Sequence, residues 1–238
     1  MGIRPILAIA AKELNSYFAS FIAYAVIAGF LFVTGAFFSL SVLLSRQVNL
    51  RFTLTDVAII LLFVSPAITM RLLAEEQASG TLELLVTSPV RELEIVLGKF
   101  LAALAFLIVM LAATAYYPLL LISYSQPDPG PILTAYLGLF LQGAAFISLG
   151  LFVSALTRNQ VVAYIFTFAL LLIIWLFEAI SGIFGGQLGL VLSYLAFYNH
   201  FLDFPKGVVD TKDVVFYLSV VVFGLVLAER TLESRRWR

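Results

Sequence analysis

Long stretches without a charged residue are the feature that most constrains this chain. Setting aside its single histidine, the 238 residues contain seven prominent uncharged runs. They are residues 14–45, 57–70, 100–127, 129–157, 159–177, 179–202 and 214–228. A helix needs about 20 apolar residues to cross the hydrocarbon core of a bilayer, and most of these runs approach or exceed that length. The pattern predicts an all-α integral membrane protein.

The composition excludes several other classes of protein. Apolar residues make up 62% of the chain and charged residues 12%, with a mean hydropathy of +1.07. These values fit neither a water-soluble domain nor a disordered chain. The 14 basic and 14 acidic residues cancel, which removes the electrostatic basis for a nucleic-acid partner. With no cysteine and one histidine, we expect no disulfide, no thiol nucleophile and no two-histidine zinc site.

Six of the runs predict membrane spans. We expect them near residues 20–44, 55–74, 95–122, 132–156, 160–180 and 212–230. The remaining run is broken by glycines and is too short after them to cross the bilayer. Residues 181–211 therefore form either an ordinary outer loop or a re-entrant or interfacial segment, and we favour the second interpretation.

The basic residues predict how the spans are oriented. An even number of spans places both termini on one side of the membrane. The termini and the loops on their side carry ten Lys and Arg residues, and the opposite loops carry four. Because basic residues concentrate on the cytoplasmic side, we expect both termini in the cytoplasm and the chain in the cell (inner) membrane.

Two segments outside the spans have helical patterns. Residues 1–18 place apolar side chains at helical spacing, which predicts an amphipathic helix in the membrane interface. The alternative is that span one simply extends further into the cytoplasm. Residues 75–94 contain Gly80, which can end the helix leaving span two, and Thr81, which can cap a short amphipathic helix. This segment is either a docking element for a cytoplasmic partner or a solvated loop.

The same segment resembles the signature of ABC type-2 transporter permeases. The pattern is Glu75-x4-Gly80-Thr81-Leu-Glu83-Leu-Leu-x3-Pro89, followed by Gly98-Lys99 at the start of a span. The ending of the chain is also similar to that family. It reads His200-Phe-x2-Phe-x2-Gly207-Val-Val-Asp210, then Asp213 before span six. Within the family the chain is most similar to the gliding-motility permeases.

The resemblance implies a single permease domain over residues 1–238 that exports a substrate or drives a membrane-associated machine. Its partners would be cytoplasmic ATP-binding-cassette ATPase subunits, a second permease copy or paralogue in a dimer, and the lipid bilayer. The contact with the ATPase would be formed by a coupling segment containing Glu75, Glu76, Gly80, Thr81, Glu83 and Pro89. ATP and Mg would bind to the partner, because this chain has no Gly-x4-Gly-Lys-Ser/Thr phosphate loop. We therefore expect a non-catalytic subunit without a cofactor or metal of its own.

Other residues support weaker hypotheses. Glu178, near the outer end of span five, makes an ion-coupled secondary transporter the alternative function, although a structural role is favoured. Pro66 in span two predicts a kink and a possible gate. His200 is expected to be a surface histidine beside Asp203 rather than a metal ligand. Small and polar residues of span four suit helix–helix contacts, namely Gln142, Gly143, Gly150 and Ser154.

Overall fold

The computed structural model describes residues 2–45, 50–81, 90–124 and 128–236, and this part of the chain contains only helices. Six of them are long and apolar enough to cross a membrane. This confirms the prediction of a multi-pass, all-α membrane protein with six candidate spans. These candidate spans lie within Phe21–Leu43, Leu50–Ser79, Glu92–Ile122, Pro129–Leu156, Gln160–Phe184 and Thr211–Ser234, and the second and third of these ranges each include a turn.

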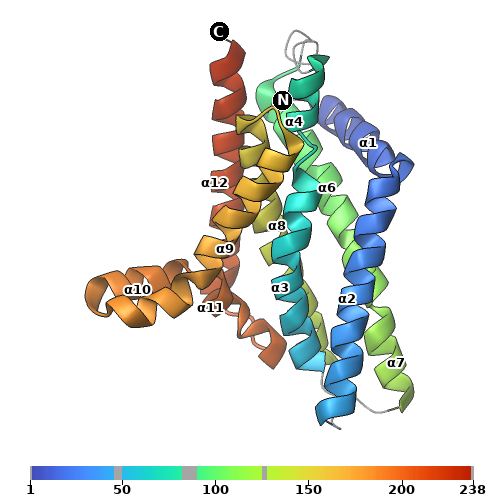
Figure 1. The fold of residues 1–238 in the computed structure, drawn as a ribbon, viewed down its shortest axis with the longest axis vertical. Helices are drawn as coiled ribbons and strands as arrows, with labels where there is room; N and C mark the ends of the chain where they lie inside the picture. Colours follow the sequence, from blue (N-terminus) through green and yellow to red (C-terminus); the bar gives the residue numbers. More distant parts are fainter. Residues whose placement is uncertain (1, 46–49, 82–89, 125–127, 237–238) are drawn as a thin grey trace.

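The helices follow one another in the order that Figure 1 labels. The first half of the chain forms α1 (Ile3–Ala19), α2 (Phe21–Ser45), α3 (Leu50–Thr69), α4 (Ala74–Ser79), α6 (Glu92–Thr114) and α7 (Tyr116–Tyr124). The second half forms α8 (Pro129–Leu156), α9 (Gln160–Phe184), α10 (Gly186–Leu195), α11 (Phe197–Phe201), the short 3₁₀ helix η1 (Phe204–Lys206) and α12 (Thr211–Arg236).

Helix α8 is the centre of the bundle. It packs against α3, α6, α9 and α12, and most of it is buried. Its small and polar residues mediate these contacts, as the sequence predicts. The Gln142 side-chain amide donates to the Ala58 carbonyl oxygen at 3.1 Å. A Cβ on Gly150 would lie 2.2 Å from Oγ1 of Thr69, so the glycine sets how closely α3 and α8 approach.

The predicted third span is not one continuous helix. It is divided at Ala115 into α6 and α7. Pro118 has no N–H to give to the carbonyl of Thr114, so regular helical bonding is interrupted there. The Tyr117 hydroxyl donates to the Leu31 carbonyl oxygen at 3.0 Å, which holds α7 against α2.

The predicted N-terminal helix is present as α1, which ends at Ala19 before Ser20 takes an extended conformation. Its inward face includes the buried residues Ile6 and Tyr17 and packs on α6, whereas Ile3 and Leu7 point outward and are exposed. A Cβ on Gly98 of α6 would lie 2.8 Å from Ile9, so the glycine permits this close packing. The location of α1 in the membrane interface stays a prediction.

The glycine-rich segment before the last span forms a helical hairpin. Helices α9 and α10 are joined at Gly185 and Gly186, whose φ angles of 54° and 56° favour glycine. The end of α9 and the whole of α10 project sideways from the bundle (Figure 1). Many of its apolar side chains are exposed, including Ile183, Leu188 and Leu190. That it re-enters the membrane stays a prediction.

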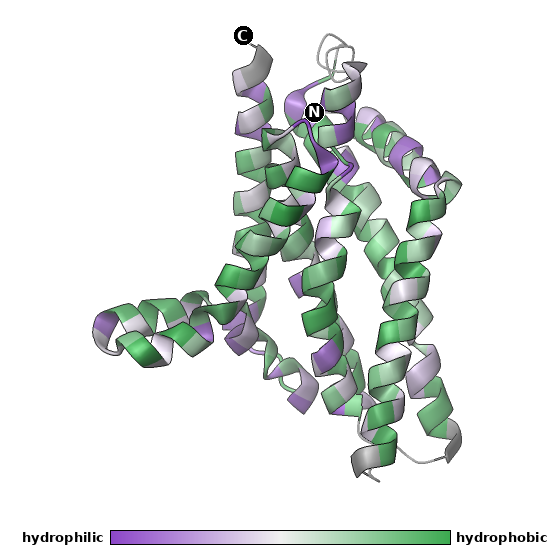
Figure 2. Cartoon of the chain, in the orientation of Figure 1, coloured by the Kyte–Doolittle hydropathy of each residue, from purple (hydrophilic) through white to green (hydrophobic). Residues whose placement is uncertain are grey.

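Hydrophilic residues gather at particular places on this fold. The long helices are mainly apolar, whereas polar residues concentrate near α1 and α4 and around the segment that leads from α11 into α12 (Figure 2). Both termini lie at the α1–α4 end of the bundle (Figure 1). We call this the termini end.

Candidate functional site

Helix α4 lies at the termini end, where the sequence predicts a coupling segment. The chain leaves α3 at Thr69, turns through residues 70–73, and then forms α4. Glu75 and Glu76 occupy the first turn of α4, where carboxylates interact favourably with the helix dipole. Gly80 ends the helix with φ of 74°, in the left-handed region, which confirms the predicted helix stop.

Lys99 is the buried centre of an ionic cluster between α1, α4 and α6. Its Nζ donates to Oε1 of Glu13 on α1 at 2.9 Å and lies 2.9 Å from Oε2 of Glu76 on α4. The side chain of Lys99 is only 1% exposed. Lys12 adds a longer ion pair to Glu76, at 3.8 Å. The cluster connects three helices that are distant in sequence. A buried ammonium group needs such partners to offset its desolvation.

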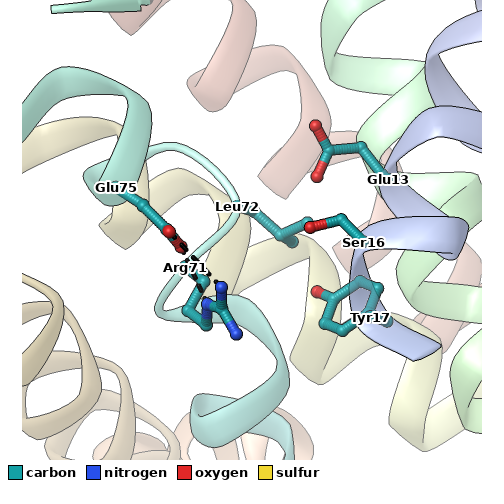
Figure 3. Close-up of a pocket in the computed structure, with 6 residues that line it drawn as sticks. All are labelled: Glu13, Ser16, Tyr17, Arg71, Leu72 and Glu75. Carbon is teal, nitrogen blue, oxygen red and sulfur yellow. Dashed lines mark hydrogen bonds and ion pairs between the residues drawn. The ribbon is translucent and has the colours of Figure 1, made fainter. Parts of the chain in front are cut away.

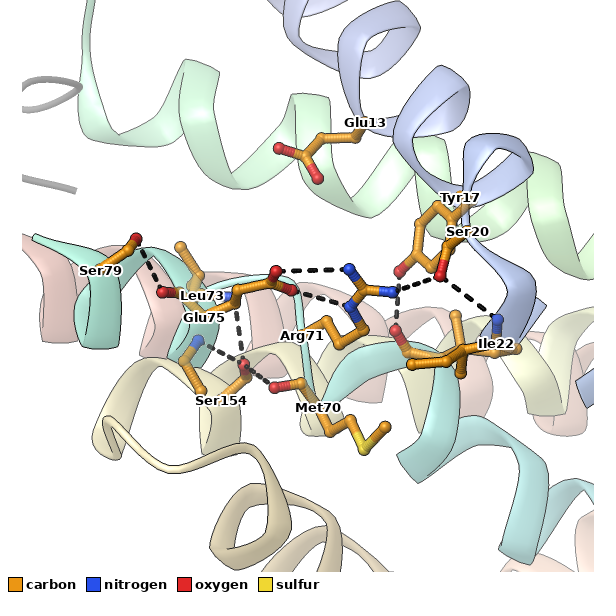
Figure 4. A network of polar contacts seen from close by, with 12 residues as sticks. Glu13, Tyr17, Ser20, Ile22, Met70, Arg71, Leu73, Glu75, Ser79 and Ser154 are labelled. Atoms are coloured by element: carbon orange, nitrogen blue, oxygen red, sulfur yellow. Dashed lines mark hydrogen bonds and ion pairs between the residues drawn. The ribbon is translucent and has the colours of Figure 1, made fainter. Parts of the chain in front are cut away.

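Arg71 forms a second connection from the α3–α4 turn. Its guanidinium binds both carboxylate oxygens of Glu75, with Nε–Oε2 at 2.8 Å and Nη2–Oε1 at 3.3 Å. Nη1 donates to Oγ of Ser20, the residue between α1 and α2, at 2.9 Å (Figure 4). A bidentate pair of this kind fixes geometry as well as charge. Arg71 therefore attaches the start of α4 to the end of α1. We call Glu13, Arg71, Glu75, Glu76 and Lys99 the junction.

Ser154, near the end of α8, anchors α4 from the other side. Its hydroxyl oxygen accepts the backbone N–H groups of Leu73 and Ala74, each at 3.1 Å (Figure 4). The Gln77 side-chain amide donates to the carbonyl oxygens of Ser154 and Ala155. The sequence predicts a helix contact for Ser154 but not this cap, because about 80 residues separate the partners.

A small cavity lies beside the junction. Its volume is about 30 Å³, and Glu13, Ser16 and Tyr17 of α1 face Arg71, Leu72 and Glu75 across it (Figure 3). This is space for about one water molecule. The Tyr17 hydroxyl donates to the Ile68 carbonyl oxygen at 2.7 Å, and burial raises the pKa of Tyr17 far above its usual range. The cavity is therefore a packing feature of the junction, too small for a transported molecule.

The structure places only part of the predicted coupling segment. Glu75, Glu76 and Gly80 lie at the junction or at the end of α4. Thr81 follows directly, and its hydroxyl lies 2.9 Å from that of Ser79. Glu83 and Pro89, with the short helix predicted after Thr81, lie outside the described residues.

Two further predicted residues occupy different parts of the molecule. Pro66 is buried inside α3, one turn before the α3–α4 turn begins. Glu178 lies far from the junction, at the base of the α9–α10 hairpin. Its Oε2 accepts from Ser193 Oγ at 3.2 Å and from the side-chain amide of Asn199. These contacts join α9 to α10 and α11.

His200 differs from its prediction as a surface residue beside Asp203. It is 4% exposed, and its Nδ1 lies 2.7 Å from Oδ1 of Asp213. The prediction was wrong because α11 folds back onto the first turn of α12, which brings together two residues 13 positions apart. The available signal in the sequence was Asp213, a carboxylate at the start of a predicted span.

The junction consists of charged side chains, two cations and three carboxylates, that pair with one another. In the described ranges, no three His, Cys, Asp or Glu side chains are grouped to hold a metal ion. What this arrangement can do is mechanical, because a displacement of α4 acts directly on α1, α6 and α8.

Comparison with known families identifies the family to which the chain belongs. Residues 47–213, more than two thirds of the chain, match the model of the ABC-2 family transporter proteins. The chain belongs to the ABC-2 transporter family. No curated protein matches it. An ABC-2 permease is the membrane component of an ABC transporter, generally non-catalytic, and it normally works with an ATPase subunit.

Proposed function

We propose that this chain is the permease subunit of an ATP-driven exporter of the inner membrane. A separate cytoplasmic ATPase would dock at the termini end, on α4 and the residues that follow it. The observation that carries this proposal is the junction. It ties α4 to α1 and α6 at the position where the family motif places the coupling segment.

The contacts of α4 support its role as a transmission element. A helix of six residues cannot hold a fixed position by its own hydrogen bonds. Here Lys99, Arg71 and Ser154 attach it to three longer helices. A push on α4 from the cytoplasm would therefore move the ends of α1, α6 and α8 together, rather than bending a loop.

The proposed orientation and partners follow from the charges and the family. Ten of the 14 basic residues belong to the termini and their loops, which favours a cytoplasmic termini end. The ATPase would supply the site for ATP and Mg. A second copy of this chain or a paralogue would complete the membrane part, and the motif resemblance supports a relation to the gliding-motility permeases.

Copurification tests the proposal. The tagged full chain, extracted from its native membranes in mild detergent, should bring down a cytoplasmic ATPase with measurable ATP hydrolysis. Glu83→Lys should reduce the amount recovered, because it reverses a charge in the predicted contact. Glu233→Lys is the control, since it makes the same charge reversal at a partly exposed side chain of α12, outside the motif. An intact chain that elutes alone, from cells shown to express the ATPase, would contradict the proposal.

A further inference from the structure

The second polar region of the molecule lies where α10, α11 and α12 meet. It contains His200 and Asp213, both from the motif at the end of the chain, and neither takes part in the junction. Both side chains are buried, His200 with 5% and Asp213 with 1% of its surface exposed. The ring of His200 stacks on Phe216 with centroids 3.8 Å apart and meets Tyr194 edge-on at 5.3 Å.

Both ring nitrogens of His200 face hydrogen-bond acceptors. Nδ1 lies 2.7 Å from Oδ1 of Asp213, and Nε2 lies 2.7 Å from the carbonyl oxygen of Tyr194. Tyr194 belongs to the last turn of α10, and Asp213 to the first turn of α12. The histidine is therefore the polar link between the projecting hairpin and the last span.

These two contacts limit where the protons of the pair can lie. A carbonyl oxygen has no proton to give, so Nε2 must donate to Tyr194. The short contact between Nδ1 and Oδ1 needs a second proton, on either the imidazole or the carboxyl group. Both contacts are hydrogen bonds at the same time only when His200 and Asp213 together hold two protons. If one is lost, the remaining proton goes to the bond with the carboxylate, and the Nε2 lone pair then faces the carbonyl oxygen.

Other titratable groups around His200 and Asp213 are bound to partners of their own. On α12, the Tyr217 hydroxyl donates to the Phe197 carbonyl oxygen, and Lys212 pairs with Asp210 at 3.0 Å. In η1, Lys206 pairs with Asp203, and on α9 Glu178 is held by Ser193 and Asn199. Helix α8 contributes Phe146, whose ring packs on Phe197.

We propose that His200 and Asp213 form a proton-binding site that locks the α9–α10 hairpin to α12. With two protons bound, His200 bridges Tyr194 and Asp213. When one proton leaves to solvent, the bond from Nε2 to Tyr194 is lost and the end of α10 is released. The lock is thus closed at lower pH and opens as pH rises. It is a property of this chain alone, whether or not an ATPase binds.

The composition of the chain makes the test direct. His200 is the only histidine and there is no cysteine. Histidine labelled with ¹⁵N therefore reports the protonation of this ring alone, in the full chain in lipid bilayers. Two cysteines are introduced at exposed positions, Leu188→Cys on α10 and Val222→Cys on α12. Spin labels on these cysteines measure the distance between the hairpin and α12. Both signals are followed from about pH 5 to pH 9, where a histidine ordinarily titrates.

We expect one distance at acid pH with Nε2 protonated, then a longer or broader distribution over the same pH range in which Nε2 loses its proton. Asp213→Asn should abolish this response and keep the hairpin closed. An asparagine amide donates to Nδ1, so a neutral ring can still donate from Nε2 to Tyr194. Asp203→Asn is the matched control, because it removes a more exposed carboxylate nearby in sequence and should leave the response intact.

Three results would overturn the proposal. One is loss of the Nε2 proton with an unchanged hairpin distance. Another is a fixed Nε2 proton across the range, whether or not the hairpin moves. The third is an Asp213→Asn chain with the same pH response as the original. If that variant does not fold, the comparison of the two signals in the original chain decides alone.

Discussion

Lys99 is the residue on which the junction most depends. It is buried, and its ammonium group lies between the carboxylates of Glu13 and Glu76. Replacing it with methionine keeps the volume but leaves both carboxylates without their shared cation. Breaking a buried ion pair from one side typically costs about 3–5 kcal/mol.

The Lys99→Met change should therefore lower the free energy of unfolding by several kcal/mol, measured by denaturant titration in detergent. The matched control is Lys206→Met, which breaks the more exposed pair with Asp203 and should cost about 1 kcal/mol or less. Equal effects of the two substitutions would show that the Lys99 cluster contributes no more than a surface pair.

Gly150 sets the distance between α3 and α8. Alanine there would put a Cβ 2.2 Å from Thr69 Oγ1, and relieving such a clash typically costs about 1–3 kcal/mol. Gly182 in α9 has no atom within 4 Å of the same added Cβ. Gly182→Ala should be neutral or slightly stabilising, because alanine is the better helix former. Thermal unfolding of the two variants checks this, and a Gly150→Ala protein as stable as the original would contradict it.

At the scale of elements, a substitution in the α9–α10 hairpin distinguishes an ATP-driven permease from an ion-coupled transporter that uses Glu178. Glu178 accepts bonds from Ser193 and Asn199 at its base. Glutamine at this position retains one carbonyl oxygen as an acceptor, so Glu178→Gln should preserve the hairpin and ATP-dependent transport. Transport in vesicles, measured with the ATPase present, checks this. An ion-coupled carrier would instead lose transport with this substitution and would work without the ATPase.

The spans could be predicted from sequence because bilayer thickness imposes a minimum apolar length on each helix. The positions at which helices end or turn are harder to predict. Gly80 is predictable as a helix stop because a left-handed residue favours glycine. The turn at residues 70–73 is not predictable, since it is held by Ser154, which lies on another span. His200 was misplaced for the same reason, because its partner is fixed by packing rather than by spacing.

At the scale of the whole molecule, two clusters of charged and titratable side chains lie in separate regions. The junction holds α1, α4, α6 and α8 at the termini end, and the pair of His200 and Asp213 joins the hairpin to α12 (Figure 2). Helix α8 packs along the core between them. Sequence motifs located both regions, but only the fold shows which residues in each region contact one another.

The coupled ATPase rate tests the central claim most directly. The permease and its copurified ATPase are placed in lipid nanodiscs, and ATP hydrolysis is compared between the original chain and Gly80→Val. Valine is strongly disfavoured at a φ of 74°, so it should redirect the chain leaving α4 without disturbing the junction. We predict that the permease-dependent rate per bound ATPase falls by about tenfold, equivalent to about 1.4 kcal/mol of coupling. Gly182→Ala should leave the rate unchanged. A Gly80→Val complex with the full permease-dependent rate would contradict the assignment of α4 as the transmission element.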